Sequence, residues 1–278
     1  MEYSTILTEK FPGGVKVTIN RPAHRNSINE ELLLEFNEFL DLIEGDDSCR
    51  IVVLQGQDGI FCTGMDFEEV VKEKLETVPV REIPLASLYM KTLKRFSFLS
   101  KIFVAKIDGH AVAGGVGLVA ASDIAVATSR SEFSLPEALW GILPAMVAPF
   151  LVRRIGYQAA YRMALTTLPV SAQTALQTGL VDEVTDTPDS SIRLLCLRMS
   201  KIEDATVRHM KRYFRRMWFV NDNMEEEAVR ETSRVLSNFV VRENIYNFVN
   251  YGIFPWDKSR KNNHLQEGGG YEGHGKIK

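Results

Sequence analysis

Three short apolar runs constrain the fold of this chain more than any other feature of its sequence. They are Ile51–Leu54, Val104–Ile107 and Ile124–Ala127. Strands that are buried on both faces read as nearly continuous apolar runs, whereas strands with one face in water alternate apolar and polar residues. A segment of helical character follows each run, so strands and helices alternate along the middle of the chain. The sequence therefore predicts an α/β layered fold with a largely parallel sheet.

Local signals predict further elements around this alternation. Residues 3–20 indicate a β-hairpin, because Pro12-Gly13-Gly14 supplies a turn between two apolar segments. Asn29 is a good N-cap for a helix. That helix places apolar residues on one face, namely Leu32, Leu33, Phe36, Phe39, Leu40 and Ile43. Residues 171–178 predict a short helix that Gly179 ends as its C′ residue.

The composition changes after about residue 195. We expect residues 1–195 to form the core and residues 196–255 to form a helical region that serves in oligomerisation. Residues 256–278 are polar and rich in glycine, so we expect a disordered tail there. The apolar segment 217–220 in the helical region is the kind of patch that marks an interface. The chain is therefore expected to self-associate.

Charge and cysteine content exclude several classes of protein. The 278 residues include 33 Lys or Arg against 36 Asp or Glu, a net charge of −3, without the basic excess of a nucleic-acid-binding domain. Three widely spaced cysteines, Cys49, Cys62 and Cys196, argue against a disulfide framework and for a reducing compartment. The opening residues lack a signal-peptide pattern, and no apolar stretch approaches the roughly 20 residues of a membrane helix. A cytoplasmic protein is expected.

Two glycine-containing turns are the strongest candidates for chemistry. They are Phe61–Asp66 and Asp108–Gly117, and each is expected to follow a strand and open a helix. Helix N-termini expose unpaired N–H groups and partial positive charge, so both turns can bind an anionic oxygen. Two such donors aimed at one carbonyl oxygen form an oxyanion hole. The alternative is that the glycines only let strand and helix pack closely.

The order of several motifs resembles one family. The motifs are Asn20-Arg21-Pro22 through Asn29, Phe61–Asp66, Gly109–Gly117, Ser134–Glu137 and Ser171–Val184. Over roughly residues 3–184 they resemble the enoyl-CoA hydratase/isomerase (crotonase) superfamily. The resemblance implies a crotonase-like layered βα superhelix with a C-terminal helical region, assembled as a homotrimer or a dimer of trimers. It also implies no cofactor, since the thioester handle, coenzyme A or phosphopantetheine, belongs to the substrate.

The resemblance assigns roles to three residues. The backbone N–H groups of Met65 and Gly114 would form the oxyanion hole for the thioester carbonyl. Glu137 would be the catalytic carboxylate, and desolvation by its apolar neighbours would raise its pKa. These neighbours are Leu135, Ala138, Leu139 and Trp140. Complementing a helix macrodipole is the alternative role for Glu137.

Other candidates lie beside these residues in the sequence. Asp66, Gly115 and His110 are the expected substrate-binding residues. Capping the following helix is the favoured alternative for Asp66, and a structural role is favoured for His110. Cys62 is expected to be buried as a small hydrophobe. The five histidines show no ligand spacing, so no metal is expected. Lys72, Lys74 and Arg81 either lie in solvent or meet a substrate carboxylate or a carrier phosphate.

One position departs from the family's pattern. Hydratases of the family carry two glutamates, and the first of them falls on Gly117, which has no side chain. In the two-carboxylate scheme both groups hold the attacking water, and one of them moves the α-proton. Ordinary enoyl-CoA hydration is therefore not expected.

A single carboxylate beside an oxyanion hole suits two reactions. One is the 1,3-proton shift of an enoyl-CoA isomerase, and the other is elimination of a β-hydroxyl. The sequence most resembles the crotonases of polyketide β-branching, in which one homologue dehydrates 3-hydroxy-3-methylglutaryl on an acyl carrier protein and another decarboxylates the product. Because Glu137 is retained as an acid/base, the dehydratase is preferred within this group, and an enoyl-CoA isomerase or a decarboxylating homologue remains the alternative. A non-catalytic scaffold subunit is the alternative from another class.

Overall fold

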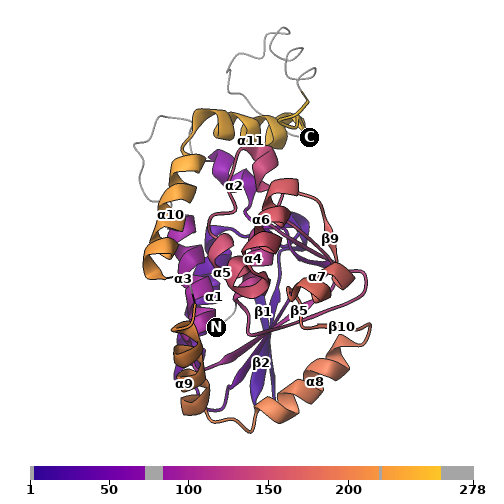
Figure 1. Ribbon diagram of the computed structural model, residues 1–278, viewed down its shortest axis with the longest axis vertical. Coiled ribbons are helices and arrows are strands. Elements are labelled where there is room, and N and C mark those ends of the chain that lie inside the picture. Colours follow the sequence, from indigo (N-terminus) through magenta and orange to yellow (C-terminus); the bar gives the residue numbers. More distant parts are fainter. Residues whose placement is uncertain (1–2, 73–83, 219–220, 258–278) are drawn as a thin grey trace.

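The computed structural model of the chain describes residues 3–72, 84–218 and 221–257 (Figure 1). In these ranges the larger sheet has six strands, in the order β1-β2-β3-β5-β7-β10. Their bounds are β1 Ile6–Phe11, β2 Gly14–Ile19, β3 Ile51–Gln55, β5 Ile102–Ile107, β7 Ile124–Ala127 and β10 Glu183–Val184. β1 and β2 pair antiparallel and the other neighbours pair parallel. The predicted hairpin and the predicted parallel sheet are both confirmed.

A second, smaller sheet was not expected from the sequence. Its order is β4-β6-β8-β9, with bounds β4 Ile60–Cys62, β6 His110–Val112, β8 Glu132–Ser134 and β9 Val170–Ser171. β4, β6 and β8 follow β3, β5 and β7 along the chain and pair parallel to one another. The chain thus passes from the large sheet to the small sheet before each helix. Because the glycine turns leave neighbouring strands β4 and β6 of the small sheet, they come together at one edge.

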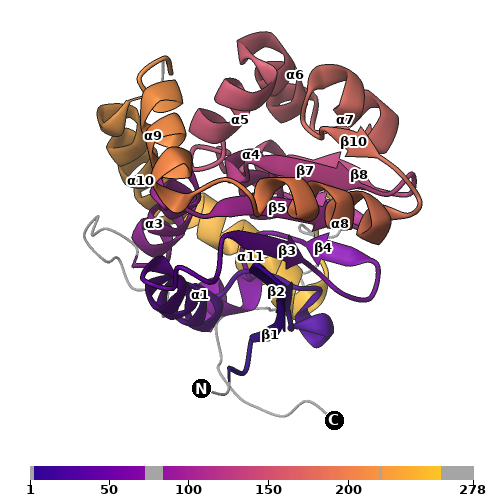
Figure 2. The same cartoon turned by 90° about the horizontal axis from the view of Figure 1, so that it is seen from below.

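The helices surround both sheets. Their bounds are η1 Pro22–His24, α1 Glu30–Glu44, α2 Phe67–Lys72, α3 Pro84–Phe98, α4 Gly114–Ala121, η2 Glu137–Trp140, α5 Ala148–Ile155, α6 Tyr157–Thr166, α7 Ala172–Thr178, α8 Pro188–Met199, α9 Asp204–Arg215, α10 Asp222–Leu236 and α11 Phe239–Tyr251. Asn29 caps α1 by accepting from the backbone N–H of Leu32 at 2.9 Å, and Gly179 ends α7 in the left-handed conformation. Figure 2 shows α5, α6 and α7 on the side of the molecule where β7 and β10 lie, and α1 on the side of β1 and β2. The helices predicted after Asn29 and after Ser171 are confirmed.

The apolar runs of the sheet are buried on both faces, as predicted. Ile51, Val53 and Val104 pack against apolar residues of α8 and α9. Val52 and Leu54, which point the other way, belong to the main core together with residues of α1, α3 and α4. This two-sided burial explains why the strands carry no apolar-polar alternation.

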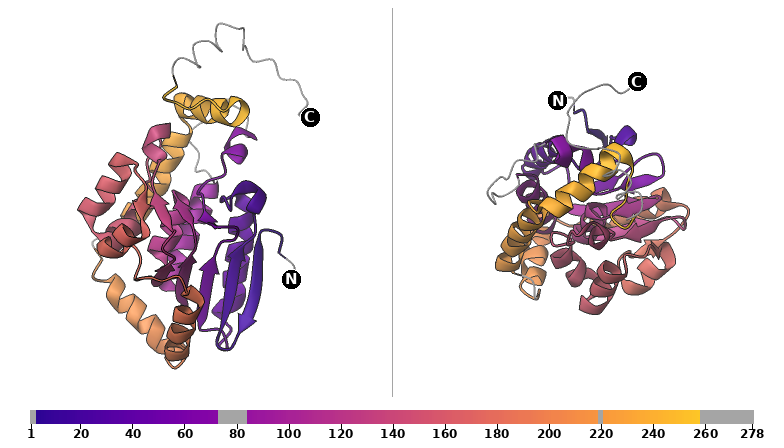
Figure 3. Two further views of the ribbon diagram at one scale, coloured as in Figure 1. Left: turned by 90° about the vertical axis from the view of Figure 1, so that its right-hand side faces the viewer. Right: turned by 90° about the horizontal axis from the view of Figure 1, so that it is seen from above.

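The C-terminal helices do not form a separate unit. The expected boundary at residue 195 falls inside α8, because that helix is continuous from Pro188 to Met199. α10 packs against α3, and α11 packs against α2 and η2. Figure 1 and the left view of Figure 3 place α11 at one end of the molecule, opposite α8 and α9. α10 and α11 therefore help to build the core that the sequence analysis assigned to residues 1–195.

The expected tail begins at residue 256, where Trp256 is 53% exposed but contacts two other aromatic rings. Its ring stacks on Phe254 with centroids 4.8 Å apart and lies 6.1 Å from the ring of Trp140. Only residues 256–257 of the expected tail lie in the described part of the chain, so its disorder stays a prediction. Residues 258–278 lie outside the described part of the chain. No helix within the described residues is both long enough and apolar enough to cross a membrane.

Candidate active site

One cavity collects most of the residues that the sequence analysis singled out. Its volume is about 660 Å³, and its walls come from both glycine turns, η2, α3, α10 and α11. Met65, Asp66, Gly114 and Glu137 line it, and most of the remaining lining side chains are apolar. An apolar cavity with a few convergent polar groups is typical of a small-molecule site.

The first glycine turn leaves the N–H of Met65 unused. On either side of this residue the backbone pairs with Ile28: the N–H of Ile28 donates to the carbonyl of Gly64 at 2.7 Å, and the N–H of Asp66 donates to the carbonyl of Ile28 at 2.9 Å. In this parallel bridge the N–H of Met65 itself points away from Ile28. Among the described residues, no hydrogen bond engages this group.

The second glycine turn leaves the N–H of Gly114 unused in the same way. Gly114 is the first residue of α4, where a helix offers unpaired donors. Before it, Ala113 adopts φ 51° and ψ −118°, an unusual conformation for a residue with a side chain. No hydrogen bond in the described ranges engages the N–H of Gly114.

The two turns touch each other. Gly64 has φ +81°, and a Cβ placed on it would lie 2.6 Å from the Cβ of Ala113 and 3.0 Å from the N of Gly114. Only glycine fits there, because any side chain would push the turns apart. The contact brings the free N–H groups of Met65 and Gly114 to the same part of the cavity.

Glu137 faces this cavity from the start of η2. Its Oε2 is buried, and no group in the described part of the chain hydrogen-bonds to it. Burial raises the pKa of Glu137 to about 7, which confirms the predicted direction and the predicted cause. Not all of the expected neighbours contribute, because Ala138 and Leu139 are exposed while Leu135 and Trp140 are buried. Two of the four expected neighbours are therefore placed to keep water from Glu137, and one of them, Trp140, also lines the cavity.

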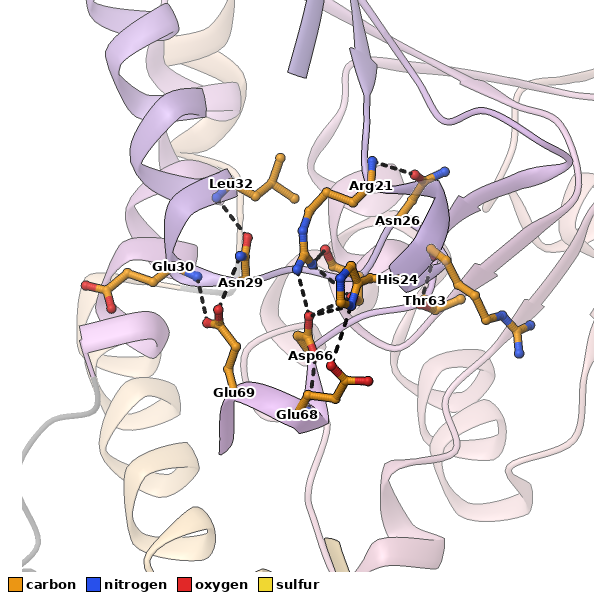
Figure 4. Close-up of polar contacts among 12 residues, drawn as sticks. Arg21, His24, Asn26, Asn29, Glu30, Leu32, Thr63, Asp66, Glu68 and Glu69 are labelled. Atoms are coloured by element: carbon orange, nitrogen blue, oxygen red, sulfur yellow. Dashed lines mark hydrogen bonds and ion pairs between the residues drawn. The ribbon is translucent and has the colours of Figure 1, made fainter. Parts of the chain in front are cut away.

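Asp66 is held in an ion pair (Figure 4). Its Oδ2 accepts from Arg21 at 2.8 Å and from the hydroxyl of Ser27 at 3.1 Å, and its Oδ1 accepts from the N–H of Glu68 at 3.1 Å. Burial raises the pKa of Asp66, but the hydrogen bond and charge of Arg21 outweigh it and keep this pKa below its usual value. The carboxylate thus caps the start of α2 and anchors the turn that carries Met65.

The structure brings His24 into the same network, although it lies far away in the sequence. Its Nδ1 is 3.8 Å from Asp66 and 3.7 Å from Glu68, and these three residues have the spacing of a cation site. Figure 4 shows the side chains converging beside Arg21. Because Arg21 already neutralises the carboxylate of Asp66, we treat the group as a polar network at the cavity wall and assign it no metal.

Two expected substrate-binding residues lie apart from the cavity lining. Gly115 packs against the backbone of Cys62, so closely that a Cβ would collide with the carbonyl there. His110 is exposed and lies 3.5 Å from Glu132. Cys62 is buried as expected, and its burial raises the pKa of the thiol to about 12. Gly115 therefore allows strand and helix to pack closely, and His110 belongs to the surface. Lys74 and Arg81 lie outside the described residues.

Sequence reasoning missed two cavity residues. Tyr89, on α3, places its hydroxyl 2.5 Å from the carbonyl oxygen of Gly114. Thr232, on α10, has a buried hydroxyl without a hydrogen-bond partner in the described part of the chain. The only signal for either residue is a hydroxyl on a largely apolar helix face, and a buried structural residue gives the same pattern.

Aromatic rings from distant segments cover the cavity. Trp140 has its ring centroid 5.0 Å from that of Phe67 and 4.9 Å from that of Phe248. Phe254 lies 5.0 Å from Phe248. These rings join α2, η2 and α11 into one cluster, so the C-terminal helix closes the cavity of its own chain.

Comparisons with known proteins identify the family. The sequence profile of the enoyl-CoA hydratase/isomerase family matches residues 11–259. The bacillaene synthase dehydratase PksH of Bacillus subtilis is 32% identical over 257 residues, which cover 92% of this chain and 97% of that protein. The 2,3-dehydroadipyl-CoA hydratase of Escherichia coli is 31% identical over 182 residues, covering 65% of this chain and 69% of that protein.

A solved structure from Bacillus subtilis, described as a polyketide biosynthesis enoyl-CoA hydratase (pksH), has the same fold. Its TM-score is 0.84 at 31% identity, and the match covers 91% of this chain and 100% of that one. The chain therefore belongs to the enoyl-CoA hydratase/isomerase (crotonase) family and is an enzyme of the crotonase type.

Proposed function

We propose that this protein is a crotonase-type lyase that removes water from a 3-hydroxyacyl thioester. The observation that carries the proposal is the meeting of two unused backbone N–H groups, from Met65 and Gly114, with the buried carboxylate of Glu137 in one cavity. Donors aimed at a developing oxyanion and a carboxyl group with a raised pKa are the parts that proton transfer next to a thioester requires.

In the proposed reaction the N–H groups of Met65 and Gly114 hold the thioester carbonyl oxygen, on which negative charge develops. The Glu137 carboxylate takes the α-proton. The electrons of the broken Cα–H bond form the Cα=Cβ double bond, and the Cβ–O bond breaks. Protonated Glu137 returns its proton to the leaving hydroxyl, which departs as water. With a pKa of about 7, this carboxyl group accepts and releases a proton readily near neutral pH.

The proposed substrate is 3-hydroxy-3-methylglutaryl on an acyl carrier protein, in polyketide β-branching. The similarity to the bacillaene synthase dehydratase, over 92% of this chain, supports this choice. We propose that no cofactor is needed, because the carrier's phosphopantetheine, or coenzyme A in its place, supplies the thioester. All three cysteines are free, which fits a reducing compartment such as the cytoplasm.

A second candidate reaction is the 1,3-proton shift of an enoyl thioester. The presence of one carboxylate favours it, since a single base can remove a proton and return it at another carbon. Decarboxylation needs a carboxylate on the substrate and yields carbon dioxide, so its product is distinct. A non-catalytic scaffold has no need for a buried carboxylate oxygen that finds no hydrogen-bond partner among the described residues, and loss of Glu137 would not change its function.

We also propose that the chain self-associates, as a trimer or a dimer of trimers. In the expected apolar patch, Met217 is 55% exposed. Trp218 instead contacts two guanidinium groups: the Cζ atoms of Arg153 and Arg215 lie 4.5 Å and 4.6 Å from its ring centroid. Residues 219–220 lie outside the described residues. Tyr213 and Phe214, on the preceding turn of α9, extend the exposed apolar surface. Light scattering at micromolar concentration tests the proposal, and a monomer mass would contradict it.

The reaction is tested with three thioesters: 3-hydroxy-3-methylglutaryl on a carrier protein, the same acyl group on coenzyme A, and crotonyl-CoA. Mass spectrometry should show loss of one water from the carrier-bound substrate. Glu137→Gln keeps the shape of the side chain but removes the transferable proton, so turnover should fall about a thousandfold or more. Glu132→Gln, which changes an exposed carboxylate nearby, is the control and should keep activity. Brisk hydration of crotonyl-CoA that Glu137→Gln does not slow would refute the proposal.

A further inference from the structure

Tyr89 makes contacts that the reaction above does not use. Its hydroxyl donates to the carbonyl oxygen of Gly114 at 2.5 Å. A Cβ placed on Gly114 would lie 3.4 Å from this hydroxyl, and a Cβ placed on Gly117 would overlap it. The hydroxyl therefore lies against the first turn of α4, between residues 114 and 117.

The tyrosine ring reaches this place through the core. Its side chain is 7% exposed and lines the cavity together with Glu137. Burial, followed by the nearby charges of Cys62 and Glu137, raises the pKa of Tyr89 well above its usual value. The phenol is therefore neutral and acts as a hydrogen-bond donor, so it does not replace a carboxylate as a base.

We propose that Tyr89 is a positioning residue of the oxyanion hole, and that its hydroxyl takes the space that a side chain at position 117 would need. The proposal rests on the proposed function, because it treats the N–H of Gly114 as an oxyanion donor. Glycine has more backbone freedom than other residues. An N–H group whose orientation is not fixed stabilises an oxyanion poorly. The hydrogen bond to the carbonyl of Gly114 restricts the rotation of this residue and keeps its N–H directed into the cavity.

The same contact explains why position 117 has no side chain. The hydroxyl of Tyr89 and the Cβ of any larger residue at 117 would overlap, while the Cζ atom of the ring would lie 3.3 Å from that Cβ. The oxygen atom alone therefore causes the severe conflict. Tyr89 and Gly117 are a matched pair, and the pair keeps a second carboxylate, besides Glu137, out of position 117.

The first experiment measures the oxyanion hole directly. Acetoacetyl-CoA is the probe, because its bound enolate absorbs in the near ultraviolet and requires no turnover. In Tyr89→Phe we expect the enolate form to be about tenfold less favoured on the enzyme, with kcat about tenfold lower and KM within about twofold. Thr92→Val removes another buried hydroxyl from α3, which bonds to Asn37 and Leu88, and is the matched control. It should lower the melting temperature without changing the enolate signal.

The second experiment tests the matched pair through stability. Alanine is the better helix former, so Gly117→Ala would stabilise α4 if space allowed. With Tyr89 present we expect the folding equilibrium constant to fall about tenfold or more, and in the Tyr89→Phe background we expect most of this loss to disappear. Equal losses in both backgrounds would overturn the pairing.

The outcomes separate this proposal from the proposed function. If the wild type ionises acetoacetyl-CoA and Tyr89→Phe does so equally well, the positioning role is wrong and the proposed function stands. If the wild type neither ionises the probe nor dehydrates a thioester, the proposed function fails and the positioning role fails with it. A tenfold weaker enolate signal in Tyr89→Phe, with an unchanged signal in Thr92→Val, supports the role of Tyr89.

Discussion

The two walls of the cavity are built in different ways. One wall consists of backbone: the turns before α2 and α4 offer N–H groups, and glycines let the turns touch. The other wall consists of side chains: Trp140 and Phe248 bring aromatic rings from segments that are far apart in the sequence. Polar backbone groups act on charge at one point, whereas aromatic rings exclude water over an area. A substitution in the first wall should therefore reduce the rate, and a substitution in the second should reduce substrate binding.

Of the two walls, the backbone wall should show the larger effect on turnover. Gly114→Val adds a branched side chain at a position where even a Cβ would lie only 3.0 Å from Ile28. The backbone N–H of residue 114 should therefore move away from the thioester oxygen. Turnover should fall at least about a hundredfold, as for the loss of one oxyanion donor. Gly45→Val is the control, because a Cβ at Gly45 meets nothing within 4 Å. Near-normal turnover in Gly114→Val, with an unchanged melting temperature, would mean that the oxyanion hole lies elsewhere.

The next effect tests the carboxylate between the two walls. The folded-state pKa of Glu137, about 7, lies above its ordinary value of 4.5, so the folded protein binds more protons between these pH values. The corresponding stability is fully present below pH 4.5 and is lost as the pH rises through 7. Glu137→Gln removes this loss, so at pH 8 its stability relative to the wild type should be higher than at low pH by about 3 kcal/mol.

The control for this effect is the same pair of proteins at pH 4, where their difference should be smaller by that amount. Urea unfolding at both pH values measures it. A constant difference from pH 4 to pH 8 would show that the carboxylate is not desolvated.

A smaller effect is expected in the side-chain wall. Phe248→Ala removes a ring that packs on Trp140 and Phe67, so water should enter the cavity and KM should rise about tenfold with kcat changed less than about threefold. Phe239→Ala on the same helix is the control, because Phe239 is 60% exposed. A fall in kcat with constant KM would remove the distinction between the two walls.

The smallest effect concerns backbone strain. Ala113 has φ 51°, which a residue with a Cβ adopts at a cost, so Ala113→Gly should raise the stability by about 1 kcal/mol. Ala120→Gly, within α4, should instead lower it by a similar or larger amount. Thermal unfolding of the two variants measures both signs. A destabilised Ala113→Gly would show that this conformation carries no strain.

The sequence predicted the parts of the structure that depend on neighbouring residues. The turns, the N-cap Asn29 and the apolar strands depend on neighbouring residues, and the structure confirms the elements predicted from them. The small sheet was missed because its strands have only two or three residues, too few for a periodic pattern.

The rest of the site depends on contacts between distant residues. Tyr89 meets Gly114 across 25 positions of the chain, and its sequence context is that of an ordinary core residue. Gly115 and His110 belong to the second turn, yet neither lines the cavity: Gly115 packs against Cys62, and His110 is exposed beside Glu132. Glu137 was predicted to be desolvated by four adjacent residues, of which the structure buries Leu135 and Trp140 and leaves Ala138 and Leu139 exposed. Local patterns carry no information about such contacts.

The overlap between the hydroxyl of Tyr89 and any Cβ at position 117 also bears on how such a site can change by mutation. A carboxylate cannot enter at 117 while the tyrosine is present, because the new side chain has no space. Removing the tyrosine first gives an intermediate that has lost the hydrogen bond to the carbonyl of Gly114 and does not yet have a second carboxylate. Each single substitution is unfavourable. A change from a site with Glu137 alone to a site with a second carboxylate at position 117 therefore requires both substitutions together, or a stabilising substitution elsewhere in the chain. This barrier would preserve a one-carboxylate lineage once it had formed.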